Sequence, residues 1–230
     1  MLDMSLAGKR LSFSDYDVPC VILAKRLLGL HLCRRLDSGE EVKGMIVETE
    51  SYLGGDDKAS HSFAGKRTER NSAMYMKPGT AYVYSTYGMY FCLNVSSKGE
   101  GAAVLIRALE PICGVETMLE NRMKNQRKKV NDKKTIKLVD LSNGPSKLCM
   151  SFDINKTLNK VDMVKSEKLW LERPMNDILD NDNNKIIACS RIGIEYAGKE
   201  WSSKPLRFYI RGNQCVSKRD KKAELSFISE

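Results

Sequence analysis

The stretch from residue 80 to residue 110, TAYVYSTYGMYFCLNVSSKGEGAAVLIRALE, decides the fold of this chain. Its β-branched, aromatic and other apolar residues fall into three runs, at Thr80–Thr86, Met89–Ser97 and Ala102–Glu110. The dipeptide Tyr87-Gly88 separates the first two runs, and a turn around Gly99 separates the last two. Runs of this kind joined by short turns predict three consecutive antiparallel strands.

The segments on either side add strands and a few helices. The spacing of apolar residues predicts a helix over Ser14–Leu30, and the turn residues at 37–39 predict a hairpin of His31–Leu36 and Glu41–Tyr52. The other expected elements are a helix from Val115 to about Lys129, a short helix over Pro145–Met150, and strands at Lys168–Glu172, Lys185–Tyr196 and Leu206–Arg211. We expect one domain over residues 1–230, with a basic loop or helix end at 121–137 and a loose tail from about residue 218.

Composition limits the class of protein. The 38 Lys and Arg residues outnumber the 29 Asp and Glu residues, and the formal charge of +9 suits a nucleic-acid partner. The apolar stretches are too short to cross a bilayer, and residues 1–11 lack a secretory hydrophobic segment, so membrane and secreted classes are not expected. The seven cysteines are never spaced as C-x-x-C and there are only two histidines, so we expect reduced thiols, no metal and no cofactor.

Two carboxylates lie in the second strand of the predicted hairpin. With a period of two, Ile46, Glu48, Glu50 and Tyr52 share one face of that strand. Glutamate is uncommon in strands and a buried carboxylate needs a partner, so the pattern indicates either a functional site or a salt-bridged edge. Arg107, in the third strand of the meander, is a candidate partner that would keep a glutamate ionised.

The turn between the first two meander strands carries an aromatic residue. Gly88 can adopt a positive φ, which places Tyr87 at or beside the tip of the hairpin. A tyrosine there is either packed across the sheet, a contact for a partner, or a wedge that enters a base stack.

The loop at 53–70 contains a histidine and several basic residues. If this loop folds over the Glu50 face, His61 would join Tyr52 and Tyr84 around a pocket suited to a flat heterocycle. Lys66, Arg67 and Arg70 would then approach phosphates.

These residues stand within a longer series of motifs that resembles the alkyladenine (3-methyladenine) DNA glycosylases of the methylpurine type. The motifs are IVETESYLG at 46–54, MKPGT at 76–80, YVY at 82–84, YGMYFC at 87–92, LIRALEP at 105–111, GPSKL at 144–148 and KPLRFY at 204–209. They are ordered and span nearly the whole chain. The resemblance implies an α+β fold, a single mixed domain around a curved antiparallel β-sheet with a protruding β-hairpin and peripheral helices.

The resemblance also implies a role for individual residues. Glu50 would deprotonate the attacking water, which Arg107 and the backbone carbonyl of Ile192 would help to hold. The walls of the base pocket would be Tyr52, His61, Tyr84, Asn94 and Leu105. Asn94 would crowd the exocyclic amine of an undamaged guanine. The residues on the DNA would be Tyr87 as the intercalating side chain, Met89 beside it, Lys66 and Arg70.

The expected function is that of a monofunctional, monomeric base-excision-repair glycosylase. It would flip 3-methyladenine, 7-methylguanine, hypoxanthine or ethenoadenine out of double-stranded DNA and hydrolyse the N-glycosidic bond, leaving an abasic site. It would act in the nucleus of a eukaryote or the cytoplasm of a bacterium. Two alternatives remain at this point: a carbohydrate glycosidase that uses Glu48 and Glu50 as its acid–base pair, and an architectural protein that bends DNA with Tyr87 and removes no base.

Overall fold

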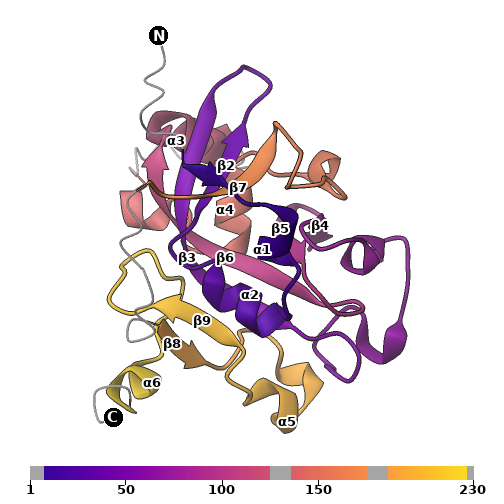
Figure 1. The fold of residues 1–230 in the computed structure, drawn as a ribbon. Coiled ribbons are helices and arrows are strands. Elements are labelled where there is room, and N and C mark those ends of the chain that lie inside the picture. The colour runs from indigo at the N-terminus through magenta and orange to yellow at the C-terminus, as the bar shows by residue number, and fades with distance from the viewer. Residues whose placement is uncertain (1–7, 125–135, 176–185, 227–230) are drawn as a thin grey trace.

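A computed structural model describes residues 8–124, 136–175 and 186–226 of the chain. Within these ranges the strands form one nine-stranded antiparallel sheet with helices around it, which confirms the expected α+β class (Figure 1). The strands are β1 (Lys9–Arg10), β2 (His31–Arg35), β3 (Glu41–Tyr52), β4 (Ala81–Thr86), β5 (Tyr90–Ser96), β6 (Ala103–Cys113), β7 (Leu169–Arg173), β8 (Ile186–Cys189) and β9 (Arg207–Ile210). The α-helices are α1 (Phe13–Tyr16), α2 (Cys20–Arg26), α3 (Val115–Lys124), α4 (Pro145–Ser151), α5 (Lys199–Ser202) and α6 (Lys221–Ser226).

The long strand β3 is the centre of the sheet. The main path of strands runs β1-β7-β2-β3-β6-β5-β4, and β9 pairs with both β3 and β8 off this path. One edge of β3 pairs with β6 over residues 43–52. The other edge pairs with β2 over Glu41–Met45 and then with β9 over Glu48–Glu50. The predicted meander and first hairpin are therefore present, and β3 changes partner just before the two glutamates.

An irregularity at this point corrects one expectation. Val47 on β3 and Arg107 on β6 each lack a direct partner in the register between the two strands. A β-bulge of this kind turns two successive side chains toward one face. Ile46 therefore packs in the main core, on the face that α2 covers, whereas Glu48 and Glu50 lie on the opposite face. The prediction that Ile46 shares a face with the glutamates was wrong.

The first helix also differs from the prediction. Instead of one helix over 14–30, α1 and α2 are separated at Pro19, which caps α2. Proline has no N–H to donate and disfavours helical backbone at the preceding residue, so the segment cannot continue as one helix. The second helix keeps its apolar side, with Leu23 and Ala24 buried against the sheet.

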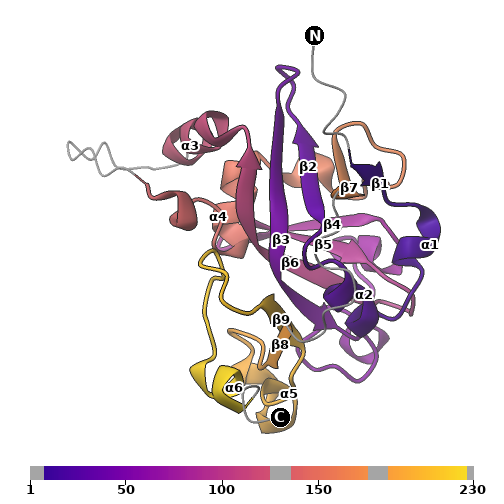
Figure 2. The ribbon, with the colours of Figure 1, turned by 60° about the vertical axis from the view of Figure 1, so that its left-hand side comes forward.

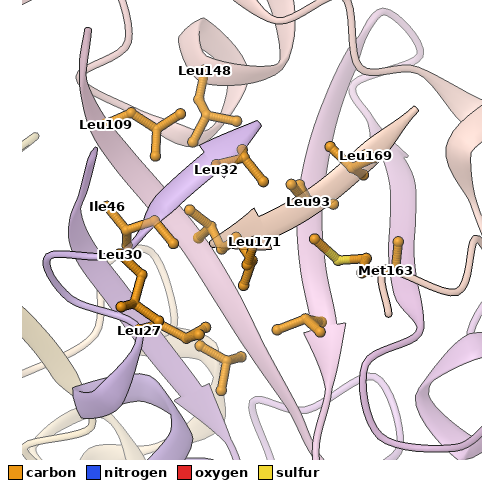
Figure 3. Packing of buried hydrophobic residues seen from close by; sticks show 14 of the residues in the cluster. Leu27, Leu30, Leu32, Ile46, Leu93, Leu109, Leu148, Met163, Leu169 and Leu171 are labelled. Atoms are coloured by element: carbon orange, nitrogen blue, oxygen red, sulfur yellow. The ribbon is translucent and has the colours of Figure 1, made fainter. Parts of the chain in front are cut away.

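The main core fills the space between the sheet and helices α2 and α4. Figure 3 shows Leu27 and Leu30 from the end of the α2 segment converging on Ile46, Leu32 and Leu171 from three strands. Burying such side chains stabilises the fold by roughly 1.5–3 kcal/mol each. The site described below lies on the other face of β3, so the core holds the strand firmly while leaving its glutamate side free for polar contacts.

The C-terminal part of the chain packs beside the far end of β3 (Figure 2). The strand expected over Lys185–Tyr196 is only β8, since the chain leaves the sheet after Cys189. The tail expected to be loose from residue 218 instead contains α6, where the buried Glu224 accepts a hydrogen bond from Tyr209 (2.9 Å) and pairs with Arg219. The part of the basic segment between residues 125 and 135 lies outside the described residues. No helix in the described ranges has the length and apolarity to span a membrane.

Candidate active site

One row of directly opposed residues crosses five strands and defines the site. Tyr82 on β4 faces Asn94 on β5, Asn94 faces Leu105 on β6, and Leu105 faces Glu50 on β3. Arg207 on β9 continues the row on the other side of Glu50. Directly opposed residues of neighbouring strands point to the same face of a sheet. Three of the expected site residues, Glu50, Asn94 and Leu105, are therefore brought together by strand register alone.

Glu50 is completely buried and accepts hydrogen bonds on both carboxylate oxygens. Its Oε1 accepts from the backbone N–H of Ile192 (2.9 Å) and lies 3.1 Å from Nη1 of Arg107. Its Oε2 accepts from the hydroxyl of Tyr52 (2.9 Å). These contacts fix the direction of the carboxylate. The atom of Ile192 that touches Glu50 is its amide nitrogen; a role for its carbonyl stays a prediction.

Arg107 is the charge partner that the sequence indicated, and the structure gives it two carboxylates. Its Nε lies 3.3 Å from Oε1 of Glu48, while its Nη1 reaches Glu50. Burial alone lowers the pKa of the Arg107 guanidinium, but the negative charges of Glu50 and Glu48 outweigh burial and raise this pKa above its usual value. Arg107 therefore carries a permanent positive charge beside Glu50. Arg107 lies two residues beyond Leu105 on β6, so the alternation of the strand points its guanidinium to the face that carries Glu50.

An aromatic group lies next to the Glu50 carboxylate. The rings of His61 and Tyr84 meet edge to face with centroids 4.7 Å apart, and the rings of Tyr82 and Tyr84 are 5.2 Å apart. His61 Nδ1 is 2.8 Å from the hydroxyl of Tyr82. The loop at 53–70 thus folds over the sheet as expected. Tyr82, whose sequence showed only an aromatic-rich strand, is the partner that orients the histidine.

The pKa shifts of Tyr52 and His61 favour the neutral forms of both side chains. Burial, followed by the charge of Glu50, raises the pKa of the Tyr52 hydroxyl well above its usual value. Desolvation and the nearby cations Arg70 and Lys66 lower the pKa of His61. At neutral pH the side chains of Tyr52 and His61 are therefore uncharged, while Arg107 carries a positive charge.

The residues expected to contact DNA are exposed on the surface. Tyr87 is 90% exposed and has φ +52°, with Gly88 at φ +70° beside it, in the turn that joins β4 to β5. Met89, in the same turn, and Lys66 are also exposed. Arg70 lies over the ring of Tyr84, 5.3 Å from its centroid, and donates a hydrogen bond to the carbonyl of Ser85 (3.1 Å).

A buried ion pair that the sequence did not reveal joins two loops of the site. Asp57 and Arg191 are fully buried and form two hydrogen bonds of 2.7 and 2.8 Å. The guanidinium of Arg191 also lies 4.8 Å from the centroid of the Tyr52 ring. Asp56 and Asp57 adjoin in the sequence, and Arg191 fell within an expected strand, so no local pattern singled out either residue. The pair ties the His61 loop to the segment that carries Ile192.

Comparisons with known proteins show which family the chain is similar to. A family model described as methylpurine-DNA glycosylase matches residues 14–214. The human "DNA-3-methyladenine glycosylase" is 48% identical over 215 residues, which cover 94% of this chain and 70% of the relative. The "Probable DNA-3-methyladenine glycosylase" of Encephalitozoon cuniculi is 52% identical over 204 residues, covering 88% of this chain and 90% of the relative.

Bacterial proteins are similar too. The "Putative 3-methyladenine DNA glycosylase" of Clostridium botulinum (strain Loch Maree / Type A3) is 44% identical over 210 residues, covering 90% of this chain and 98% of the relative. The chain spans between 63% and 70% of the lengths of its human, mouse and rat relatives. The family match over most of the residues, together with these identities, shows that the chain belongs to the methylpurine-DNA glycosylase family.

Proposed function

We propose that this protein removes damaged purines from double-stranded DNA, with Glu50 as the general base. The observation that carries the proposal is the buried Glu50 carboxylate, held by Arg107, Tyr52 and the Ile192 N–H, beside the aromatic group of Tyr84 and His61. A fixed carboxylate beside aromatic rings on which a base can stack is what hydrolysis of an N-glycosidic bond in DNA requires.

The reaction is a displacement by water at the anomeric carbon of the sugar. The water oxygen forms a bond to that carbon, the N-glycosidic bond breaks, and the base leaves with the electron pair. Glu50 takes a proton from the water, and its negative charge stabilises the positive charge that builds on the sugar. A cationic alkylated base such as 3-methyladenine or 7-methylguanine leaves as a neutral molecule. A neutral base such as hypoxanthine or ethenoadenine needs a proton or a hydrogen bond to leave.

Access to the sugar requires that the nucleotide leave the base stack. The exposed Tyr87 supports a role as the wedge, because a bulky residue with a positive φ is strained and such strain persists mainly at functional positions. Tyr87 lies three residues beyond Tyr84 on the same hairpin, which is about 10 Å along an extended strand. Lys66, Arg70 and Met89 would contact the strand from which the base is removed.

Selection of the base would rest on the fit of the pocket. Damaged or mispaired bases cost less to unstack, which favours their entry. The amide of Asn94 is held in place by a hydrogen bond to the carbonyl of Tyr82 (3.1 Å), so it cannot easily make room for the exocyclic amine of guanine. Relatives come from animals, a microsporidian and bacteria, and we place the protein, as a monomer, in the nucleus of a eukaryote or the cytoplasm of a bacterium.

The contacts of Glu48 argue against a carbohydrate glycosidase with a Glu48 and Glu50 pair. Glu48 is fully buried, and its oxygens accept from Arg107, Arg207 and the backbone N–H of Ser217. The two carboxylates therefore share a guanidinium between them instead of flanking a space for a sugar ring and a water.

Base release from single-lesion duplexes tests the proposal. The full chain is incubated with duplexes that each carry one hypoxanthine or ethenoadenine, and the free base and abasic site are measured. We expect release by the wild type and a loss of at least about 100-fold in Glu50→Gln, the range for a positioned general base. A DNA-bending protein without activity would bind the duplex but release no base. Equal rates in wild type and Glu50→Gln would refute the role of Glu50.

A further inference from the structure

Glu48 is a second buried carboxylate, and the proposed reaction assigns it no role. It is fully buried on the same face of β3 as Glu50. Its Oε1 accepts from Arg107 Nε (3.3 Å) and Arg207 Nη1 (2.8 Å), and its Oε2 accepts from the N–H of Ser217 (2.8 Å). These partners of Glu48 are two arginines and a backbone N–H, whereas Glu50 also contacts Tyr52, an expected wall of the base pocket.

The four ionised groups of this cluster alternate in sign. In order they are Glu50, Arg107, Glu48 and Arg207, with contacts of 3.1, 3.3 and 2.8 Å between neighbours. Their formal charges sum to zero, and all four side chains are buried, where electrostatic effects are strong. Arg207 is further held by the backbone carbonyls of Ser190 (2.7 Å) and Lys218 (2.6 Å), so it cannot move to a new partner without losing these bonds.

We propose that Glu48 is a positioning residue that holds one side of the Arg107 guanidinium, so that Arg107 orients Glu50 without neutralising it. This inference rests on the proposed role of Glu50 in base release. If Arg107 were paired with Glu50 alone, its charge would act fully on that carboxylate and make it a weaker proton acceptor. The negative charge of Glu48 offsets part of the positive charge of Arg107, and the positive charge of Arg207 in turn compensates that of Glu48.

Other groups that face Glu50 must be considered before a pH effect is assigned. The charged ones are Arg107 on β6, Glu48 on β3, Arg207 on β9, and the Arg191–Asp57 pair from the two loops. The neutral ones are Tyr52, Tyr84, Cys92, Cys189 and Tyr196, whose pKa values are raised, with burial as the main cause. These five stay protonated over the range in which a carboxylate titrates. Of the charged groups, only Glu48 shares Arg107 with Glu50.

The test compares two single variants that change the charge of the cluster in opposite directions. Single-turnover base release is measured from pH 4.5 to 9 with saturating enzyme. Glu48→Gln leaves an extra positive charge near Glu50, so the acid limb of the rate profile should move down by about one pH unit. Arg207→Met leaves an extra negative charge, so the acid limb should move up. The double variant restores neutrality, so its profile should return toward that of the wild type.

Two further variants separate this effect from a general loss of structure. Glu172→Gln removes another buried carboxylate, which lies on β7, two strands away from β3, and pairs with Lys43 near the start of β3. This variant should lower stability without moving the profile. Glu48→Asp keeps the charge and should recover the position of the acid limb. Circular dichroism melting checks that each variant folds. If Glu48→Gln does not fold, the upward shift in Arg207→Met and its reversal in the double variant decide the question.

The outcomes are distinct. Shifts of opposite sign in the two single variants support the proposal. An unmoved acid limb, or shifts in the same direction, in variants that fold would overturn it while leaving base release by Glu50 intact. Failure of the wild type to release base, or release that is insensitive to Glu50→Gln, would instead remove the proposed function.

Discussion

Replacing Asp57 by Asn removes the only carboxylate that pairs directly with Arg191 among the described residues. Both side chains are fully buried, and the two hydrogen bonds between them measure 2.7 and 2.8 Å. Asn keeps an oxygen that can accept from the backbone N–H of Leu53 or Ala59, as Asp57 does at 3.0 and 3.1 Å. The change therefore mainly leaves a buried guanidinium without its counter-charge.

The expected loss is large. Breaking a buried ion pair by removing one partner typically costs about 3–5 kcal/mol of the free energy of unfolding. In a domain of this size, ~1 kcal/mol lowers Tm by roughly 2–4 °C, so the melting temperature should fall by about 6–20 °C. Base release should fall as well, because Arg191 lies over the ring of Tyr52 and directly precedes Ile192.

Thermal unfolding followed by circular dichroism measures the first effect, and base release at a temperature where the variant is folded measures the second. Asp37→Asn is the matched control, since the Asp37–Lys168 pair is exposed and its loss should leave Tm unchanged within error. A fall in Tm of less than about 2 °C in Asp57→Asn would refute the reasoning that this pair stabilises the two loops.

Three further predictions follow from exposed or titrating residues. Tyr87→Gly should raise Tm slightly, because Tyr87 is exposed with φ +52° and a left-handed conformation costs a non-glycine residue roughly 1–2 kcal/mol. The same change should weaken binding to a lesion duplex, and unchanged binding would contradict the role of Tyr87 as a wedge. Because the pKa of His61 is lowered in the folded state, the unfolded chain takes up a proton first as pH falls through about 6.5. The Tm of the wild type should therefore drop more between pH 7 and pH 5 than the Tm of His61→Asn. Parallel curves of Tm against pH for the two proteins would count against this. Lys66→Ala should weaken duplex binding at low salt and reduce the slope of log affinity against log salt by about one, whereas an unchanged slope would show that Lys66 contacts no phosphate.

The elements of the fold were largely readable in the sequence. Strands β4, β5 and β6 follow from runs of β-branched and aromatic residues between turn signals, and these signals depend only on neighbouring residues. The clustering of Glu50, Asn94 and Leu105 then follows from antiparallel register. The prediction of one helix over 14–30 was wrong because it relied on the spacing of apolar residues and gave too little weight to Pro19. The effect of this proline on the backbone could have been read from the sequence.

Other features depend on contacts between distant residues. Asp57 and Arg191 are 134 positions apart, and Glu48 and Arg207 are 159 apart, so no local period or motif could pair them. The bulge at Val47 shifts the alternation of β3 by one residue, so that Ile46 lies on the face opposite to the two glutamates. Residue pattern alone thus determined the strands of the meander and the motifs of the family, because each is recorded in short stretches of chain. Only the tertiary structure decided which buried charges meet, because an ionised side chain in the interior takes the partner that folding brings within hydrogen-bond distance, wherever that partner lies in the sequence.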